Sequence, residues 1–171
     1  SGQLCCSRKA HTNSDNLSYK YDPGNIPLVD MTMGQLLEKA VKEWPDREAF
    51  VSIPQGIRLT YRQTLDRVDR IAAGLKKLGL KPGDRVGIWG PNAIAWALSF
   101  LAITRAGFIA VGINPAYRQM EFNYCLNRVG VSAVIAPASF KTQNYASMIL
   151  NAKSISPSLQ HIILYSSDHV P

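Results

Sequence analysis

The sequence predicts an α/β fold, a mainly parallel sheet with flanking helices, on the strength of three observations. From residue 85 onward, short apolar runs alternate with helical patterns, the order that single-helix crossovers between parallel strands produce. The longest stretch of mostly apolar residues, 93–113, is typical of the helices and strands of a sheet covered on both faces. Of the 171 residues, 46% are hydrophobic and 18% are charged, a composition that can bury a core and excludes disordered, collagenous and coiled-coil proteins.

Regular structure is expected to begin after residue 27. Residues 1–27 are polar and aperiodic and are interpreted as a tail. Residues 1–12 are basic and contain no acid, which is typical of the remnant of an organellar transit peptide. Thr32 and Gln35 then form a capping box, and apolar residues at helical spacing predict an amphipathic helix that ends before Pro45.

A hairpin and a second helix are predicted next. Residues 48–53 and 57–60 flank a Pro-Gln-Gly turn and form the expected hairpin. Thr60 and Gln63 repeat the capping-box pattern at the start of the helix, and Gly79 follows its last turn in the position that favours glycine.

The alternating part of the chain supplies the predicted parallel sheet. Its elements are strand 85–89, helix 93–106, strand 108–113, a helix marked by Phe122 to Val129, strand 131–136, helix 141–152 and strand 161–165. We expect Asn92 to cap the helix at 93–106 through its side chain. The chain ends six residues after the last strand without a closing helix, so the layer is expected to be a truncated part of a larger domain.

A membrane span is the alternative interpretation of residues 93–113, which are long enough to cross a bilayer. Arg105 lies near the middle of this run, where an arginine costs about 2.5–3.5 kcal/mol on insertion scales. Gly107 divides the run into a helical and a strand-like half. We therefore predict a buried helix followed by a buried strand, and no transmembrane segment.

Patterns that would carry chemistry are sparse. The three cysteines, Cys5, Cys6 and Cys125, are too few for a disulfide framework and lack metal-ligand spacing. The sequence contains no phosphate-binding glycine loop and no nucleophile elbow. The net charge of +7 is not gathered on one stretch, which argues against a nucleic-acid partner. These patterns predict no catalytic residue and no metal site.

Two loops follow predicted strands at the edge where open parallel sheets bind ligands. They are Gly90 to Asn92 and Asn114 to Tyr117. Each also has a structural interpretation, with Asn92 as a helix cap and Asn114-Pro115 as the start of a turn.

Three runs, in this order along the chain, resemble motifs of the adenylate-forming superfamily of acyl-CoA synthetases, luciferases and adenylation domains. They are Leu59-Thr60-Tyr61-Arg62-Gln63, Gly79-Leu80-Lys81-Pro82-Gly83-Asp84-Arg85-Val86, and the run from Ala102 to Val111 that leads into Asn114-Pro115-Ala116-Tyr117. Three further runs are most similar to the mitochondrial medium-chain acyl-CoA ligases. These are Trp89-Gly90-Pro91-Asn92, Asn114-Pro115-Ala116-Tyr117 and Phe140-Lys141-Thr142-Gln143.

The resemblance implies a two-step ligase. A fatty acid carboxylate attacks ATP to give an acyl-adenylate and pyrophosphate, and the thiol of coenzyme A then displaces AMP, with Mg²⁺ and a cation holding phosphate charge. Residues 28–171 would form the incomplete N-terminal subdomain of this fold. The family's phosphate loop, its Tyr-Gly-x-Thr-Glu segment and its C-terminal lysine do not occur in this sequence, so no catalytic residue is carried over and the chain alone is expected to be inactive.

The resemblance also implies a site and a location. In related ligases the loop after the second parallel strand lies toward the coenzyme A channel, so Asn114 and Tyr117 are the expected cofactor-binding residues. The expected location is the mitochondrion, and otherwise the cytoplasm. The alternative function is a stand-alone, non-catalytic α/β module that binds a nucleotide or a partner.

Overall fold

The computed structural model describes residues 24–26 and 28–166. The predicted polar tail, residues 1–27, therefore lies outside the described residues except for 24–26. The chain divides into two compact units, residues 1–30 and 31–171. In the first unit, the described residues include a bend and contain no helix or strand. The second unit contains the elements described below.

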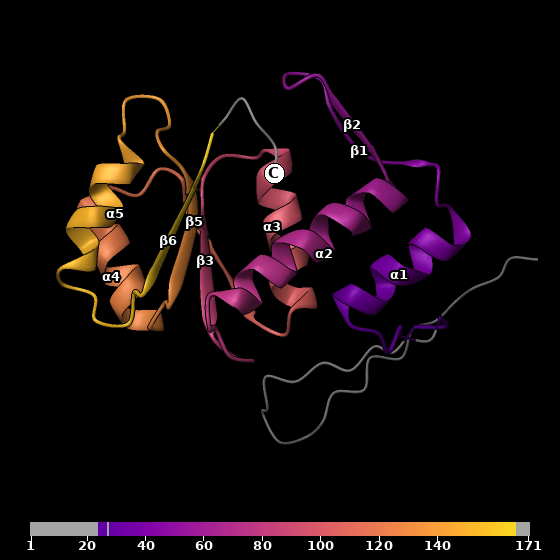
Figure 1. The fold of residues 1–171 in the computed structure, drawn as a ribbon, viewed down its shortest axis with the longest axis horizontal. Coiled ribbons are helices and arrows are strands. Elements are labelled where there is room, and N and C mark those ends of the chain that lie inside the picture. The colour runs from indigo at the N-terminus through magenta and orange to yellow at the C-terminus, as the bar shows by residue number, and fades with distance from the viewer. Residues whose placement is uncertain (1–23, 27, 167–171) are drawn as a thin grey trace, which may run out of the picture. The chain divides into compact units, whose positions relative to one another are not determined.

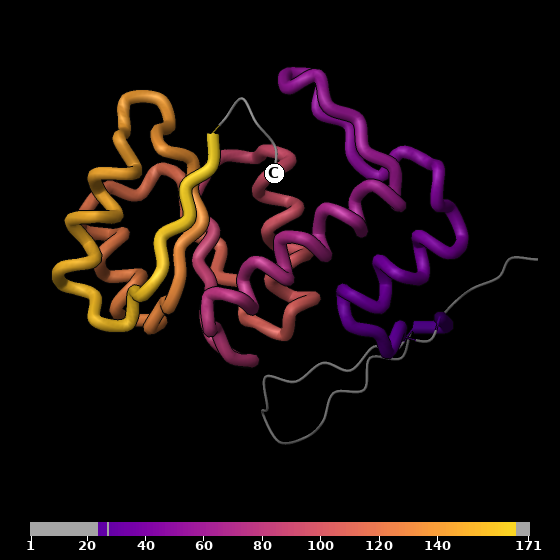
Figure 2. The backbone as a smooth tube through the Cα atoms, in the orientation of Figure 1, coloured from indigo at the N-terminus to yellow at the C-terminus, as the bar shows by residue number. Residues whose placement is uncertain are grey.

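Helices and strands follow the predicted order (Figure 1). They are α1 (Met33–Glu43), β1 (Glu48–Ser52), β2 (Ile57–Thr60), α2 (Tyr61–Lys77), β3 (Arg85–Trp89), α3 (Ile94–Arg105), β4 (Ile109–Ile113), α4 (Gln119–Val129), β5 (Ala133–Pro137), α5 (Tyr145–Lys153) and β6 (His161–Tyr165). The backbone trace in Figure 2 shows β1 and β2 as a separate hairpin, and these strands pair antiparallel.

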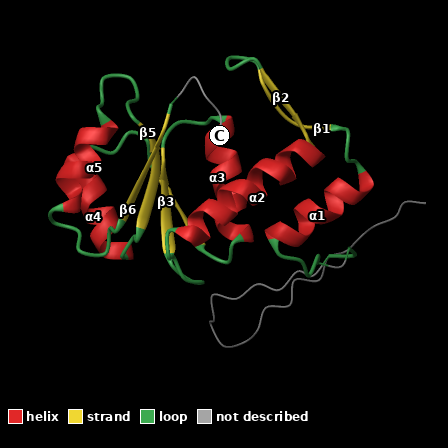
Figure 3. Ribbon diagram, viewed as in Figure 1, coloured by secondary structure: helices red, strands yellow, loops and turns green. Residues whose placement is uncertain are grey.

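The predicted parallel sheet is confirmed. Its strand order is β4-β3-β5-β6, and all three pairings are parallel. Helices α2 and α3 cover one face, and α4 and α5 cover the other (Figure 3). Helix α3 connects β3 to β4 on one face, and α5 connects β5 to β6 on the other. The strand order therefore reverses between β3 and β5.

Two apolar cores hold these layers together. One lies between the sheet and α2 and α3, and its fully buried members include Val68, Leu98 and Ile103. The other lies between the sheet and α4 and α5 and centres on the indole of Trp89. Because both faces of the sheet are covered, β5 and the residues of β3 after Arg85 are all apolar, which explains why these central strands have no alternation in sequence.

Both predicted capping boxes are confirmed. The Thr32 hydroxyl accepts from Gln35 N, and the Gln35 side chain accepts from Thr32 N, at 3.2 and 2.8 Å. Thr60 and Gln63 repeat the arrangement at the start of α2. These reciprocal bonds satisfy backbone donors that a helix start otherwise leaves unpaired, which fixes where each helix begins.

The expected cap of α3 is wrong. The residue at the N-cap position is Ala93, and Asn92 makes no capping hydrogen bond there. Instead, Ile94 N donates to Gln55 Oε1 at 3.1 Å, and Gln55 comes from the turn between β1 and β2. The donor is thus satisfied by a residue 39 positions away in sequence, which no local pattern indicates.

Two predicted starts shift by two residues or more. Strand β5 begins at Ala133 rather than at residue 131. Helix α5 begins at Tyr145 rather than at residue 141, because Phe140 and Gln143 pair in a small antiparallel bridge and Lys141 has a φ of 52°. A left-handed residue cannot continue a right-handed helix, so the start is delayed until Asn144 provides a side-chain cap.

The long apolar run resolves into α3 and β4, as predicted. Arg105 at the end of α3 pairs with Asp69 of α2 and with Glu38 of α1, the latter at 2.8 Å. The guanidinium therefore ties three helices together, and these carboxylates raise its pKa. Among the described residues, the helices lack the length and apolar character that crossing a bilayer requires.

Candidate functional site

The loops that leave the carboxyl ends of the strands define the candidate site. Since all four strands are parallel, the segments after β3, β4, β5 and β6 emerge at the same edge of the sheet. They include both loops that the sequence predicts, Gly90 to Asn92 and Asn114 to Tyr117. This edge is where open α/β sheets bind ligands.

The point of strand reversal, between β3 and β5, is filled by protein. A Cβ added to Gly90 would lie 2.9 Å from Tyr165 Oη and 3.0 Å from Pro137 Cδ. Glycine is therefore required for this approach of β3, β5 and β6. Beside it, residues 137–139 and 164–166 line a shallow cavity of about 280 Å³.

The loop from Asn114 to Arg118 has a closely fixed main chain. Asn114 Oδ1 accepts from Ala116 N at 2.9 Å, and Tyr117 N donates to Asn114 O at 3.1 Å. The first bond is that of an Asx turn and the second is the main-chain bond of a β-turn, which confirms the structural interpretation of Asn114 as a turn former. The Asn114 side chain is itself exposed.

Three side chains from other elements donate to the carbonyls of this loop. Trp89 Nε1 donates to Asn114 O at 3.0 Å. Tyr145 Oη and Gln143 Nε2 both donate to Pro115 O, at 2.5 and 3.3 Å. In the sequence, Trp89 and Gln143 stand out only within motif-like runs, and no role is predicted for them or for Tyr145. An indole in an apolar strand and a phenol in an apolar helix look like ordinary core side chains.

The Trp89 ring lies between two other aromatic rings. Its centroid is 3.9 Å from that of Phe122 in α4 and 3.8 Å from that of Tyr145 in α5, with interplanar angles of 16° and 11°. All three side chains are fully buried. This stack fills the core on the α4 and α5 face, and two of its rings donate hydrogen bonds to the loop.

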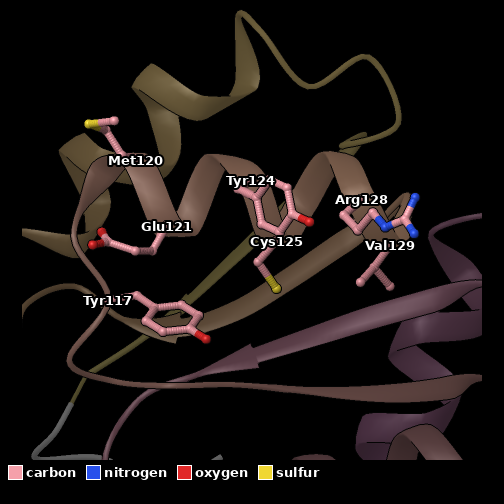
Figure 4. Close-up of a pocket in the computed structure, with 7 residues that line it drawn as sticks. All are labelled: Tyr117, Met120, Glu121, Tyr124, Cys125, Arg128 and Val129. Carbon is pink, nitrogen blue, oxygen red and sulfur yellow. The ribbon is translucent and has the colours of Figure 1, made fainter.

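Tyr117 lines an open groove of about 500 Å³ along α4 (Figure 4). The other lining residues are Met120, Glu121, Tyr124, Cys125, Arg128 and Val129. In Figure 4, the Cys125 sulfur points toward the side of α4 on which Tyr117 lies, whereas Met120 points away. Asn114 does not line this groove. The main chains of the two predicted residues are hydrogen-bonded within the turn, but only the Tyr117 side chain lies in the groove.

Burial favours the neutral forms of three side chains near this site, Cys125, Tyr145 and Tyr165. Burial raises the pKa of the Cys125 thiol. Burial also raises the pKa of Tyr145 and of Tyr165 to about 12. Residues 24–26 and 28–166 bring together no group of three histidine, cysteine or acidic side chains. The site therefore consists of a loop, residues 114–118, whose main chain is held by hydrogen bonds, and of the largely apolar groove along α4.

A second groove lies between α2 and β6, with a volume of about 400 Å³. Its walls are almost entirely apolar and include Ile71, Leu75, Leu78, Ile135 and Ile163. It opens beside β6, which is an edge strand of the sheet formed by the described residues.

Comparison with known proteins relates this fold to CoA ligases. Residues 37–171 match the family model described as AMP-binding enzyme. The chain is 42% identical over 154 residues to the human mitochondrial medium-chain acyl-CoA ligase ACSF2, covering 90% of this chain and 25% of that protein. The rat protein of the same name is also 42% identical, over 144 residues. The chain thus spans about a quarter of the length of these relatives.

Solved structures share the fold. A Mycobacterium tuberculosis fatty acyl CoA synthetase superposes with a TM-score of 0.71 at 25% identity, covering 82% of this chain and 29% of that one. The anthranilate CoA ligase AuaEII in complex with anthranoyl-AMP also gives 0.71 at 25% identity, covering 85% and 27%. The family model spans most of the 171 residues, and this chain belongs to the AMP-binding enzyme family.

Proposed function

We propose that this chain is part of an ATP-dependent fatty acid–CoA ligase. The observation that supports the proposal most strongly is the 42% identity to mitochondrial medium-chain acyl-CoA ligases over 84% to 90% of the chain. In this reaction the carboxylate oxygen attacks the α-phosphorus of ATP and pyrophosphate leaves. The coenzyme A sulfur then attacks the acyl carbon and AMP leaves. Adenylation is needed because a carboxylate is a poor electrophile.

We propose that the chain contributes the scaffold of this enzyme and a part of its coenzyme A surface, and that it does not turn over alone. ATP, coenzyme A and Mg²⁺ are the proposed substrates and cofactor of the complete enzyme, with a fatty acid as the carboxylate. Mg²⁺ stabilises negative charge on transferring phosphates when it is bound. Within this chain, Asn114 and Tyr117 are the proposed residues of the loop that faces coenzyme A, since the fixed main chain of that loop at the carboxyl edge fits a ligand-contacting role.

A pyrophosphate-release assay tests this proposal. The complete reading frame that contains this chain, given octanoate, ATP and Mg²⁺, is expected to release pyrophosphate only when the carboxylate is present. The 171-residue chain assayed in parallel is expected to stay at background. Carboxylate-dependent release by the chain alone would contradict the scaffold role, and none by the complete protein would contradict the ligase assignment.

We also propose a mitochondrial location. Relatives at 42% identity are named as mitochondrial, and residues 1–12 are basic and free of acids. A carboxyl-terminally tagged protein is expected to co-fractionate with mitochondria and to be protected there from added protease. Recovery in the cytosolic fraction alone would contradict the location.

A further inference from the structure

We propose that Trp89 and Tyr145 are positioning residues for coenzyme A binding, which act by holding the loop from Asn114 to Arg118. The inference rests on the proposed function, which brings coenzyme A to this loop. It assigns roles to two buried aromatic residues outside the loop, one at the end of β3 and one at the start of α5.

The two ring donors reach consecutive carbonyls of the loop. Trp89 Nε1 donates to Asn114 O at 3.0 Å, and Tyr145 Oη donates to Pro115 O at 2.5 Å. Because the donors belong to different elements, the loop is tied both to the centre of the sheet and to the helix layer. Moving the loop away from this position would break both bonds together.

The donors themselves have little freedom to move. Trp89 is stacked on Tyr145 on one side and on Phe122 on the other, and all three rings are fully buried. A ring packed on both faces cannot change its rotamer without displacing its neighbours. The direction of the Trp89 donor is therefore fixed by the core, and the fully buried Tyr145 ring is held between Trp89 and the tilted ring of Phe140, as a precisely held binding loop requires.

The Trp89 bond is connected directly to the turn that presents Tyr117. Asn114 O accepts from Trp89 Nε1 and also from Tyr117 N, so one carbonyl joins the core donor to the turn. The main chain of the loop is thus anchored, while the side chains of Asn114, Ala116 and Arg118 remain exposed. An anchored main chain with exposed side chains is the arrangement expected of a ligand-contacting loop rather than of core packing alone.

Two substitutions remove the donors and keep the rings. Tyr145→Phe deletes only the hydroxyl, and Trp89→Phe deletes the indole donor while leaving an aromatic ring in the stack. Matched controls are Trp96→Phe, whose ring packs on Phe100, and Tyr61→Phe, whose ring packs against Trp44. Each variant is made in the complete enzyme. We measure amide hydrogen exchange in peptides spanning residues 114–120 and the KM and kcat with coenzyme A, octanoate and ATP.

The proposal expects a split result. In both donor variants, exchange at Ala116 and Tyr117 should be faster and the KM for coenzyme A should rise about fivefold, the factor that corresponds to one lost hydrogen bond, with kcat and the KM for ATP unchanged. The controls should match the wild type in both measurements.

Each other outcome is decisive. Unchanged exchange in Tyr145→Phe, the variant with the smallest change in shape, would overturn the positioning role. Faster exchange with an unchanged KM for coenzyme A would overturn the link to binding. A wild-type enzyme that forms no acyl-CoA would contradict the proposed function and with it the coenzyme A link, whereas the exchange data would still decide whether the two rings hold the loop.

Discussion

Tyr145 and Tyr165 are two tyrosines with buried hydroxyls that differ in their hydrogen bonding. The Tyr145 hydroxyl donates to Pro115 O, whereas the Tyr165 hydroxyl has no hydrogen-bond partner among residues 24–26 and 28–166. Removing a bonded hydroxyl leaves a carbonyl less satisfied, while removing an unpaired one relieves a desolvation cost. We predict that Tyr145→Phe lowers the free energy of unfolding by about 1 kcal/mol and that Tyr165→Phe leaves it equal or higher. Urea unfolding of the two variants measures the difference, and the reverse order would contradict it.

The same two residues predict an alkaline limit of stability. Their pKa of about 12 in the folded protein lies above the ordinary value of 10.0, because burial disfavours the phenolate. Between these values the folded state holds protons that the unfolded state has lost, so unfolding becomes more favourable as pH rises from about 10 to 12. Absorbance at 295 nm should show these tyrosines ionising together with loss of circular dichroism. Ionisation of all seven tyrosines near pH 10 in an intact fold would contradict the burial.

Two glycines provide a test of close packing at the carboxyl edge. A methyl group at Gly90 would meet Tyr165 Oη and Pro137, whereas one at Gly74, inside α2, would meet nothing within 4 Å. We predict that Gly90→Ala destabilises the fold by about 1–3 kcal/mol, as overpacking does. Gly74→Ala should stabilise it by about 0.5–1 kcal/mol, because alanine favours the helix. Thermal unfolding compares the two; equal melting temperatures would show that the edge is loosely packed.

At the scale of elements, the start of α3 depends on the hairpin. Gln55 at the turn between β1 and β2 accepts from Ile94 N and from the Ser52 hydroxyl. We predict that Gln55→Ala costs about 1 kcal/mol of stability, the value of a lost helix cap, whereas Asn92→Ala costs little. Denaturant melts of both variants test this. A larger loss of stability for Asn92→Ala than for Gln55→Ala would contradict this and would support Asn92 as the helix cap, as the sequence suggested.

The elements that could be predicted are those defined by neighbours in sequence. The capping boxes at Thr32 and Thr60 can be found in the sequence because both partners lie three residues apart. The left-handed conformation of Gly130 is one that glycine adopts readily because it has no side chain. The start of α5 was missed because Lys141 takes a left-handed conformation that its residue type does not signal. Contacts between residues far apart in sequence, such as Gln55 with Ile94, cannot be predicted from the residues that flank either partner.

The candidate site was predictable only in its outline. The run of Asn, Pro, Ala and Tyr after β4 marked the loop, and the Asx turn at Asn114 is local and was foreseen. The groove that Tyr117 lines depends on how α4 packs, and the anchoring bonds depend on where Trp89 and Tyr145 meet in space. These relations join residues 25 and 30 positions apart, which composition and periodicity cannot specify.

At the scale of the whole molecule, the described residues form a covered sheet with two edge strands, β4 and β6. Beside β6 the apolar groove between α2 and the sheet remains open, with a volume of about 400 Å³. Exposed apolar surface next to a sheet edge favours association in water. This surface, and the coverage of about a quarter of the length of the relatives, fit the scaffold role proposed above.

The most direct test of the ligase assignment is to identify the product by mass spectrometry. The complete reading frame that contains this chain, incubated with octanoate, ATP, Mg²⁺ and coenzyme A, should form octanoyl-CoA and AMP in equal amounts. Without coenzyme A, it should accumulate enzyme-bound octanoyl-adenylate. Formation of neither product from octanoate, decanoate or dodecanoate, by a protein shown to be folded, would contradict the assignment.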